Sequence, residues 1–179
     1  VITVPSRELA EQLTAVAAQL ISFSDTEILL EKCIGGTDKK RQVAKLTQTQ
    51  PHIVIGTPGR IFDLMQENAL FVQTVQMMVV DEADMTFDLG FLETVDEIAS
   101  RMPENLQMSV FSATIPDKIK PFLKKYLGNP KIIQIENTQL VSPTIKNQLL
   151  VTKAQNPMDV LRQLLVMGNP YLVLIFVNT

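Results

Sequence analysis

The sequence predicts an α/β protein built on a parallel sheet with flanking helices. Short runs rich in Val and Ile alternate with longer stretches of helical periodicity, which is the pattern of βα units. Polar residues cluster directly after several apolar runs, where open parallel sheets bind ligands. With 46% hydrophobic and 20% charged residues over 179 positions, the composition is that of a folded domain and excludes disordered, collagen-like and coiled-coil classes.

The expected strands are the short apolar runs themselves. They cover residues 1–4, 28–34, 52–56, 76–80, 107–111, 131–135, 148–151 and 171–177. Between the first two runs, apolar residues recur at helical spacing and predict a helix that packs this stripe on the sheet. The stripe consists of Leu9, Leu13, Val16, Ala17 and Leu20.

The domain organisation follows from composition. Residues 137–147 contain Thr, Gln, Ser, Asn and one Pro with only three aliphatic side chains, which indicates a linker. Residues 1–136 are expected to form a first domain. Residues 148–179 supply only a strand, a helix and a strand, too little to cover both faces of a sheet. They are expected to begin a second domain.

Charge and cysteine content limit the class of partner and the location. Sixteen basic and nineteen acidic residues give a net charge of −3, so any nucleic-acid site must be local rather than spread over the surface. The single Cys33 cannot form an internal disulfide, which favours a cytoplasmic protein. The longest apolar run, residues 171–177, is too short to cross a membrane, so no membrane partner is expected.

Two adjacent carboxylates follow the apolar strand at residues 76–80. Asp81 and Glu82 are therefore delivered from a buried strand to an exposed edge. Such a pair suits Mg²⁺ bound through its waters, with the neighbouring carboxylate orienting an attacking water. The alternative is an acidic helix start that the helix dipole stabilises.

Three turns that follow strands have the chemistry of phosphate cradles. They are Pro5-Ser6-Arg7-Glu8, Gly35-Gly36-Thr37 and Thr57-Pro58-Gly59-Arg60. Free N–H groups at helix starts, glycines that permit close approach and nearby guanidinium groups all favour anions. Three such sites in a row indicate a nucleic-acid strand rather than one small anion. Each turn taken alone is better explained as an ordinary loop.

Ser112-Ala113-Thr114 follows the strand at residues 107–111 and offers hydroxyls without a titratable partner. The only histidine, His52, opens a different strand, which argues against a serine hydrolase. A switch element that hydrogen-bonds its neighbours fits better. Cys33 lies in an apolar strand and is expected to be a small buried hydrophobe rather than a metal ligand.

In this order the clusters resemble the motifs of the DEAD-box RNA helicases. The similar segments are residues 5–10 for motif Ia, Gly35-Gly36 for the GG element, Thr57-Pro58-Gly59-Arg60 for motif Ib, Val80-Asp81-Glu82-Ala83-Asp84 for motif II, Ser112-Ala113-Thr114 for motif III and residues 174–179 for motif IV. The ordered set spans the whole chain. It is far more specific than any single tetrapeptide.

The resemblance implies two RecA-like domains joined by a linker, with ATP and RNA bound across the cleft. Asp81 would hold Mg²⁺ through water, and Glu82 would position and activate the attacking water. Asp84 would contact Ser112 and Thr114, coupling hydrolysis to domain closure. The residues implied to hold the backbone of one RNA strand are Pro5, Ser6, Arg7, Gly36, Thr57, Gly59 and Arg60.

Backbone contacts carry no base information, so this family resemblance implies sequence-independent RNA binding, with local duplexes opened by bending one strand. No glycine is followed by lysine, so a phosphate-binding P-loop is missing, as are the downstream arginine-rich motifs. We therefore expect an internal helicase fragment, inactive alone, with an incomplete first domain and the start of a second RecA-like domain.

Two alternatives remain open on the sequence. The chain could be a non-catalytic nucleic-acid-binding module on the same fold, which a Gly-Lys-Thr segment upstream in the gene would argue against. It could also belong to a DNA-acting translocase. A preference for single-stranded RNA over DNA of equal length would favour the RNA helicase over the DNA translocase.

Overall fold

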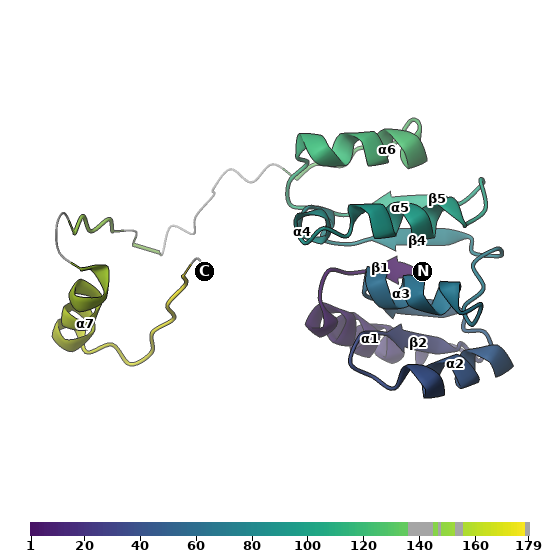
Figure 1. Cartoon of the computed structure of the whole chain (residues 1–179), viewed down its shortest axis with the longest axis horizontal. Helices are drawn as coiled ribbons and strands as arrows, with labels where there is room; N and C mark the ends of the chain where they lie inside the picture. The colour runs from purple at the N-terminus through teal and green to yellow at the C-terminus, as the bar shows by residue number, and fades with distance from the viewer. Residues whose placement is uncertain (136–144, 147, 153–155, 178–179) are drawn as a thin grey trace. The chain divides into compact units, whose positions relative to one another are not determined.

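A computed structural model describes residues 1–135, 145–146, 148–152 and 156–177 (Figure 1). The chain divides into two compact units, Val1–Lys131 and Ile132–Thr179. All of the residues singled out above for catalysis, coupling or RNA binding lie in the first unit. The predicted linker at residues 137–147 lies outside the described residues apart from 145 and 146, so the proposed domain boundaries stay predictions.

The first unit is built on a five-stranded parallel sheet. Its strands are β1 (Ile2–Thr3), β2 (Leu30–Cys33), β3 (Ile53–Gly56), β4 (Met77–Val80) and β5 (Gln107–Val110). The order across the sheet is β2-β3-β1-β4-β5, and every neighbouring pair is parallel. The predicted α/β class and the first five predicted strands are confirmed.

Helices cover both faces of the sheet (Figure 1). They are α1 (Arg7–Ile21), α2 (Lys39–Gln48), α3 (Pro58–Gln66), α4 (Ala83–Asp88), α5 (Leu92–Ser100) and α6 (Lys120–Leu127), with a 3-10 turn η1 at Asp117–Ile119. Several begin within a few residues of a strand end. Because these connections are short, their polar residues stay close to one edge of the sheet.

Adjacent residues of β3 contribute side chains to two separate hydrophobic cores. Val54 belongs to the larger core beneath α2, α3, α5 and α6, whereas Ile55 belongs to a smaller core beneath α1. Successive side chains of a strand point to opposite faces, so a strand covered on both sides is apolar throughout. Cys33 is fully buried in the larger core, and burial raises the pKa of its thiol to about 12, as expected of an inert hydrophobe.

Helix α1 packs against the smaller core with fewer of its apolar side chains than the sequence predicts. Leu9, Leu13 and Ala17 pack against this core, as expected. Val16 and Leu20 are 51% and 68% exposed, so the prediction is wrong for these two. Val16 is rotated by about 100° from Ala17 and faces solvent, and Leu20 lies in the last turn of the helix.

The second unit contains one described helix, α7 (Pro157–Gly168), which begins at the cap residue Asn156. The strands predicted at residues 131–135, 148–151 and 171–177 do not form. A strand needs a neighbour to accept and donate its backbone hydrogen bonds, and no described residue pairs with these segments. Their apolar side chains are largely exposed, including Leu149 and Phe176. Among the described residues, no helix is long and apolar enough to cross a membrane.

Candidate nucleic-acid and nucleotide site

The strand register places the polar clusters at one level of the sheet edge. Thr3 of β1 is paired with Gly56 of β3 on one side and with Val80 of β4 on the other. Gly56 is in turn paired with Cys33, and Val80 with Val110. Each predicted cluster begins one or two residues beyond these five positions. All five clusters therefore emerge from the carboxyl edge of the same sheet, as predicted.

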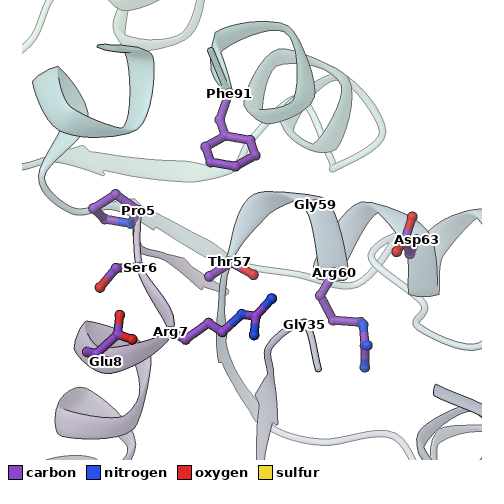
Figure 2. Close-up of a pocket in the computed structure, with 10 residues that line it drawn as sticks. All are labelled: Pro5, Ser6, Arg7, Glu8, Gly35, Thr57, Gly59, Arg60, Asp63 and Phe91. Atoms are coloured by element: carbon purple, nitrogen blue, oxygen red, sulfur yellow. The ribbon is translucent and has the colours of Figure 1, made fainter. Parts of the chain in front are cut away.

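A pocket of about 490 Å³ opens at the ends of β1, β2 and β3 (Figure 2). The residues that line it are Pro5, Ser6, Arg7, Glu8, Gly35, Thr57, Gly59, Arg60, Asp63 and Phe91. Six of the seven residues predicted to hold RNA are among them. The seventh, Gly36, follows Gly35 directly and contacts the side chain of Arg7.

The guanidinium of Arg7 lies against a bare glycine turn. It extends across the pocket toward Gly35 and Thr57 (Figure 2). A Cβ atom on Gly36 would stand 2.9 Å from Arg7 Nη1, and one on Gly35 would stand 3.2 Å from Nη2. Gly36 also has a φ of 85°, which side chains other than glycine rarely adopt. Gly36 is therefore favoured by its backbone conformation, and a side chain on either glycine would crowd the Arg7 guanidinium.

Two helix N-termini face this pocket through residues with available hydroxyls. Ser6 is the N-cap of α1, and its Oγ accepts a hydrogen bond of 3.1 Å from the Leu9 N–H. Among the described residues, no acceptor takes the hydroxyl proton of Ser6, so this proton is available to an anion. Thr57 is the N-cap of α3 and makes no side-chain cap bond. Gly59, in the first turn of α3, has nothing within 4 Å of where a Cβ would stand. Partial positive charge and close backbone access coincide here.

The acidic pair lies at the end of β4, with Glu82 in a left-handed backbone conformation (φ 48°, ψ 52°). Backbone bonds hold both sides of this residue, from Asp81 N–H to the Thr3 carbonyl and from Ala83 N–H to the Phe111 carbonyl, each 3.0 Å long. Asp81 Oδ1 accepts from the Glu82 N–H at 3.0 Å. The Glu82 side chain is exposed at the sheet edge.

Asp84 joins α4 to the segment that follows β5. Its Oδ2 accepts hydrogen bonds from the Thr114 N–H at 2.9 Å and from Thr114 Oγ1 at 2.7 Å. Its N–H donates to Ser112 Oγ at 3.1 Å, and Ser112 Oγ donates to the Thr114 carbonyl at 2.6 Å. Burial acts to raise the pKa of Asp84, but these hydrogen bonds and one from the Met85 N–H outweigh it and hold the pKa below its ordinary value. The three predicted coupling residues are in direct contact.

Comparison with known proteins decides the family. The family model for the DEAD/DEAH box helicases matches residues 1–122. The chain belongs to this family. It is 51% identical over 179 residues to the DEAD-box ATP-dependent RNA helicase CshB of Listeria monocytogenes and 48% identical over 180 residues to the CshB of Bacillus subtilis. Each match covers all of this chain and 41% of the relative, so the chain spans less than half the length of these proteins.

The fold comparison agrees with the family. A DEAD box protein of the hyperthermophile Methanococcus jannaschii superposes with a TM-score of 0.65 at 34% identity, over 73% of this chain and 35% of that one. The expected RecA-like parallel sheet of a DEAD-box helicase core is thereby confirmed.

Four residues of the pocket were not among the predicted RNA ligands. Gly35 and Glu8 belong to the helicase segments already quoted, so their proximity follows from chain continuity. Asp63 lies one turn along α3 from Arg60, and a helical-face argument would have found it. Phe91 arrives from the start of α5 and turns its ring toward the pocket (Figure 2). Nothing in the spacing of the motifs indicates it.

The donor set at the end of β4 fits a magnesium ion held through water. Among the described residues, no three His, Cys, Asp or Glu side chains gather as a metal cage. Mg²⁺ needs no such cage, because it keeps several waters and commonly takes one or two carboxylates together with substrate phosphates. Asp81 has one oxygen bonded to the Glu82 N–H and a second with no hydrogen-bond partner among the described residues.

Proposed function

We propose that this chain is part of an ATP-dependent RNA helicase, in which ATP hydrolysis is coupled to sequence-independent binding and local unwinding of RNA. The observation that carries the proposal is the single sheet edge shared by three turns of glycines, hydroxyls and arginines and by an acidic pair. The family membership of the chain supports it. ATP use, Mg²⁺ and a cytoplasmic location are parts of the same proposal.

RNA would be held through its sugar-phosphate backbone. Arg7 and Arg60 would supply charge, while the first N–H groups of α1 and α3 would donate to phosphate oxygens. Ser6 and Thr57 would add hydroxyl donors, and Pro5, Gly36 and Gly59 would let the strand approach closely. These contacts leave the base edges unread, so binding would be insensitive to sequence.

Hydrolysis would take place at the end of β4. Asp81 would hold Mg²⁺ through water, and the ion would neutralise charge on the nucleotide phosphates when bound. Glu82 would accept a hydrogen bond from the attacking water and take up its proton at the carboxylate. Asp84 would transmit closure through Ser112 and Thr114, because its carboxylate already links α4 to the segment after β5.

The test is RNA binding by the full-length protein that carries this sequence, measured with single-stranded RNA and DNA of the same length. We expect tighter binding to RNA, and Arg7→Ala should weaken it about tenfold, the equivalent of about 1.4 kcal/mol. The slope of log affinity against log salt should fall by about 0.7, the value for one lost phosphate contact on a single strand.

The matched control is Arg101→Ala, which removes one positive charge at the end of α5, where Arg101 stacks on Phe62 and pairs with Glu97. It should leave RNA binding unchanged. Equal loss in the two variants would mean that charge alone matters and would contradict a built site at Arg7. Equal affinity for RNA and DNA would contradict an RNA-specific role.

A further inference from the structure

A chain of buried polar side chains lies directly behind the RNA pocket. Arg60 of α3, Gln42 of α2 and Glu31 of β2 are only 9%, 8% and 8% exposed. Arg60 Nη1 donates to Gln42 Oε1 at 3.0 Å, and Gln42 Nε2 donates to Glu31 Oε1 at 2.7 Å. Lys45 closes the chain at the surface through Glu31 Oε2 at 2.5 Å. These hydrogen bonds therefore join α3, α2 and β2 behind the pocket.

The chemistry of its neighbours fixes the orientation of the Gln42 amide. Arg60 can only donate hydrogen bonds, so the atom that faces it must be the amide oxygen. The Glu31 carboxylate and the Lys32 carbonyl can only accept, and the latter lies 2.8 Å from Nε2. A flipped amide would place donor against donor and acceptor against acceptor. Gln42 is therefore a specific bridge between a buried guanidinium and a buried carboxylate.

The same guanidinium also holds the turn beside Arg7. Arg60 Nη1 donates to Thr37 Oγ1 at 2.9 Å, and Nη2 donates to the Thr37 carbonyl at 3.1 Å. Thr37 follows Gly36 directly. These two bonds and the one to Gln42 use three of the five N–H groups of Arg60. The remaining donors belong to a side chain that lines the pocket.

The geometry points to Gln42 as a positioning residue for RNA binding, although it does not line the pocket. It holds the Arg60 guanidinium in the orientation that fixes the glycine turn beside Arg7 through the two bonds to Thr37. This inference rests on the proposed function, since it names a residue that acts through the same RNA site.

The test measures RNA affinity and its salt dependence in the full-length protein for Gln42→Met and for Gln48→Met. Gln48 is exposed at the end of the same helix and serves as the matched control. Gln42→Met changes no charge, but it removes the acceptor that orients Arg60. We expect affinity for single-stranded RNA to fall about tenfold and the salt slope to fall by about 0.7, with wild-type values for Gln48→Met.

A second variant separates positioning from stability. Gln42→Glu keeps an acceptor for Arg60 but sets a carboxylate beside Glu31, so it should lower the unfolding temperature while the RNA salt slope stays at the wild-type value. The inference is overturned if Gln42→Met binds RNA like Gln48→Met, or if Gln42→Glu also loses slope. If Gln42→Met does not fold, the salt slope of RNA binding by Gln42→Glu decides the inference, and a reduced slope overturns it. Failure of the wild-type protein to bind RNA would instead overturn the proposed function.

Discussion

At Glu82 the backbone takes a left-handed conformation that costs a residue other than glycine about 1–2 kcal/mol. The bonds from Asp81 to Thr3 and from Ala83 to Phe111 impose it, because they fix the chain on both sides of the residue. Such strain is characteristic of positions where a side chain must be held for chemistry. The strained residue carries an exposed side chain at the end of β4.

Two substitutions at this position separate strain from chemistry. Glu82→Gln keeps the side chain and the strain but removes the base, so ATP turnover should fall at least about 100-fold with unchanged stability and ATP binding. Glu82→Gly should also lose turnover, yet it should raise the free energy of unfolding by about 1 kcal/mol because the left-handed conformation suits glycine. Steady-state turnover and chemical denaturation measure the two effects. Wild-type turnover in Glu82→Gln would remove Glu82 from catalysis.

Asp84 makes stability depend on pH in a defined direction. Its pKa in the folded protein lies below the ordinary value, so its contribution is fully present above the pKa of the unfolded chain, about 3.9, and is lost as pH falls through the folded value. The difference in unfolding free energy between wild type and Asp84→Asn should therefore be constant above about pH 5 and shrink below about pH 4. A difference that grows toward acid pH would contradict the hydrogen-bonded carboxylate.

Among the secondary-structure elements, β2 and β3 approach so closely that Gly56 admits no side chain. A Cβ there would stand 2.0 Å from the Cys33 carbonyl oxygen. Gly56→Ala should therefore destabilise the fold by about 3 kcal/mol, the upper range for overpacking. Thermal or chemical unfolding measures this. A loss below about 1 kcal/mol would show that the strands can separate at little cost.

Gly59 in α3 provides the contrasting case. Its Cβ position is empty, and alanine favours a helix over glycine by about 1 kcal/mol. Gly59→Ala should leave stability equal or improved but weaken RNA binding, because the methyl group would occupy space that the strand needs. Unchanged RNA affinity in a stable Gly59→Ala variant would place the RNA elsewhere.

Local sequence pattern was sufficient to predict the strands that pair with another strand among the described residues. The runs that became β1 to β5 each find a parallel partner, whereas the run at residues 171–177 is as apolar and forms no strand. Likewise the contacts of Asp84 follow from adjacent strand ends. The bonds from Arg60 to Thr37 and Gln42 depend on how α2 and α3 pack, and the position of Phe91 depends on the path of α5. No short-range pattern carries that information.

Across the molecule, the parallel sheet brings the proposed phosphate-binding turns, at residues 5–8, 35–37 and 57–60, to the same edge as the carboxylate pair Asp81 and Glu82. The overall net charge of −3 does not attract anions. Helix N-termini and exposed glycine N–H groups at this edge supply that attraction locally. Since the chain spans 41% of its CshB relatives, we propose that this edge is one wall of a larger helicase site.

The most direct measurement is the rate of ATP hydrolysis by the full-length protein as single-stranded RNA is added. We predict that RNA stimulates turnover, and that Arg7→Ala raises the RNA concentration for half-maximal stimulation about tenfold without lowering the rate at saturating RNA. Turnover that ignores RNA, or an Arg7→Ala variant that is stimulated like the wild type, would contradict a shared edge on which RNA binding and hydrolysis are coupled.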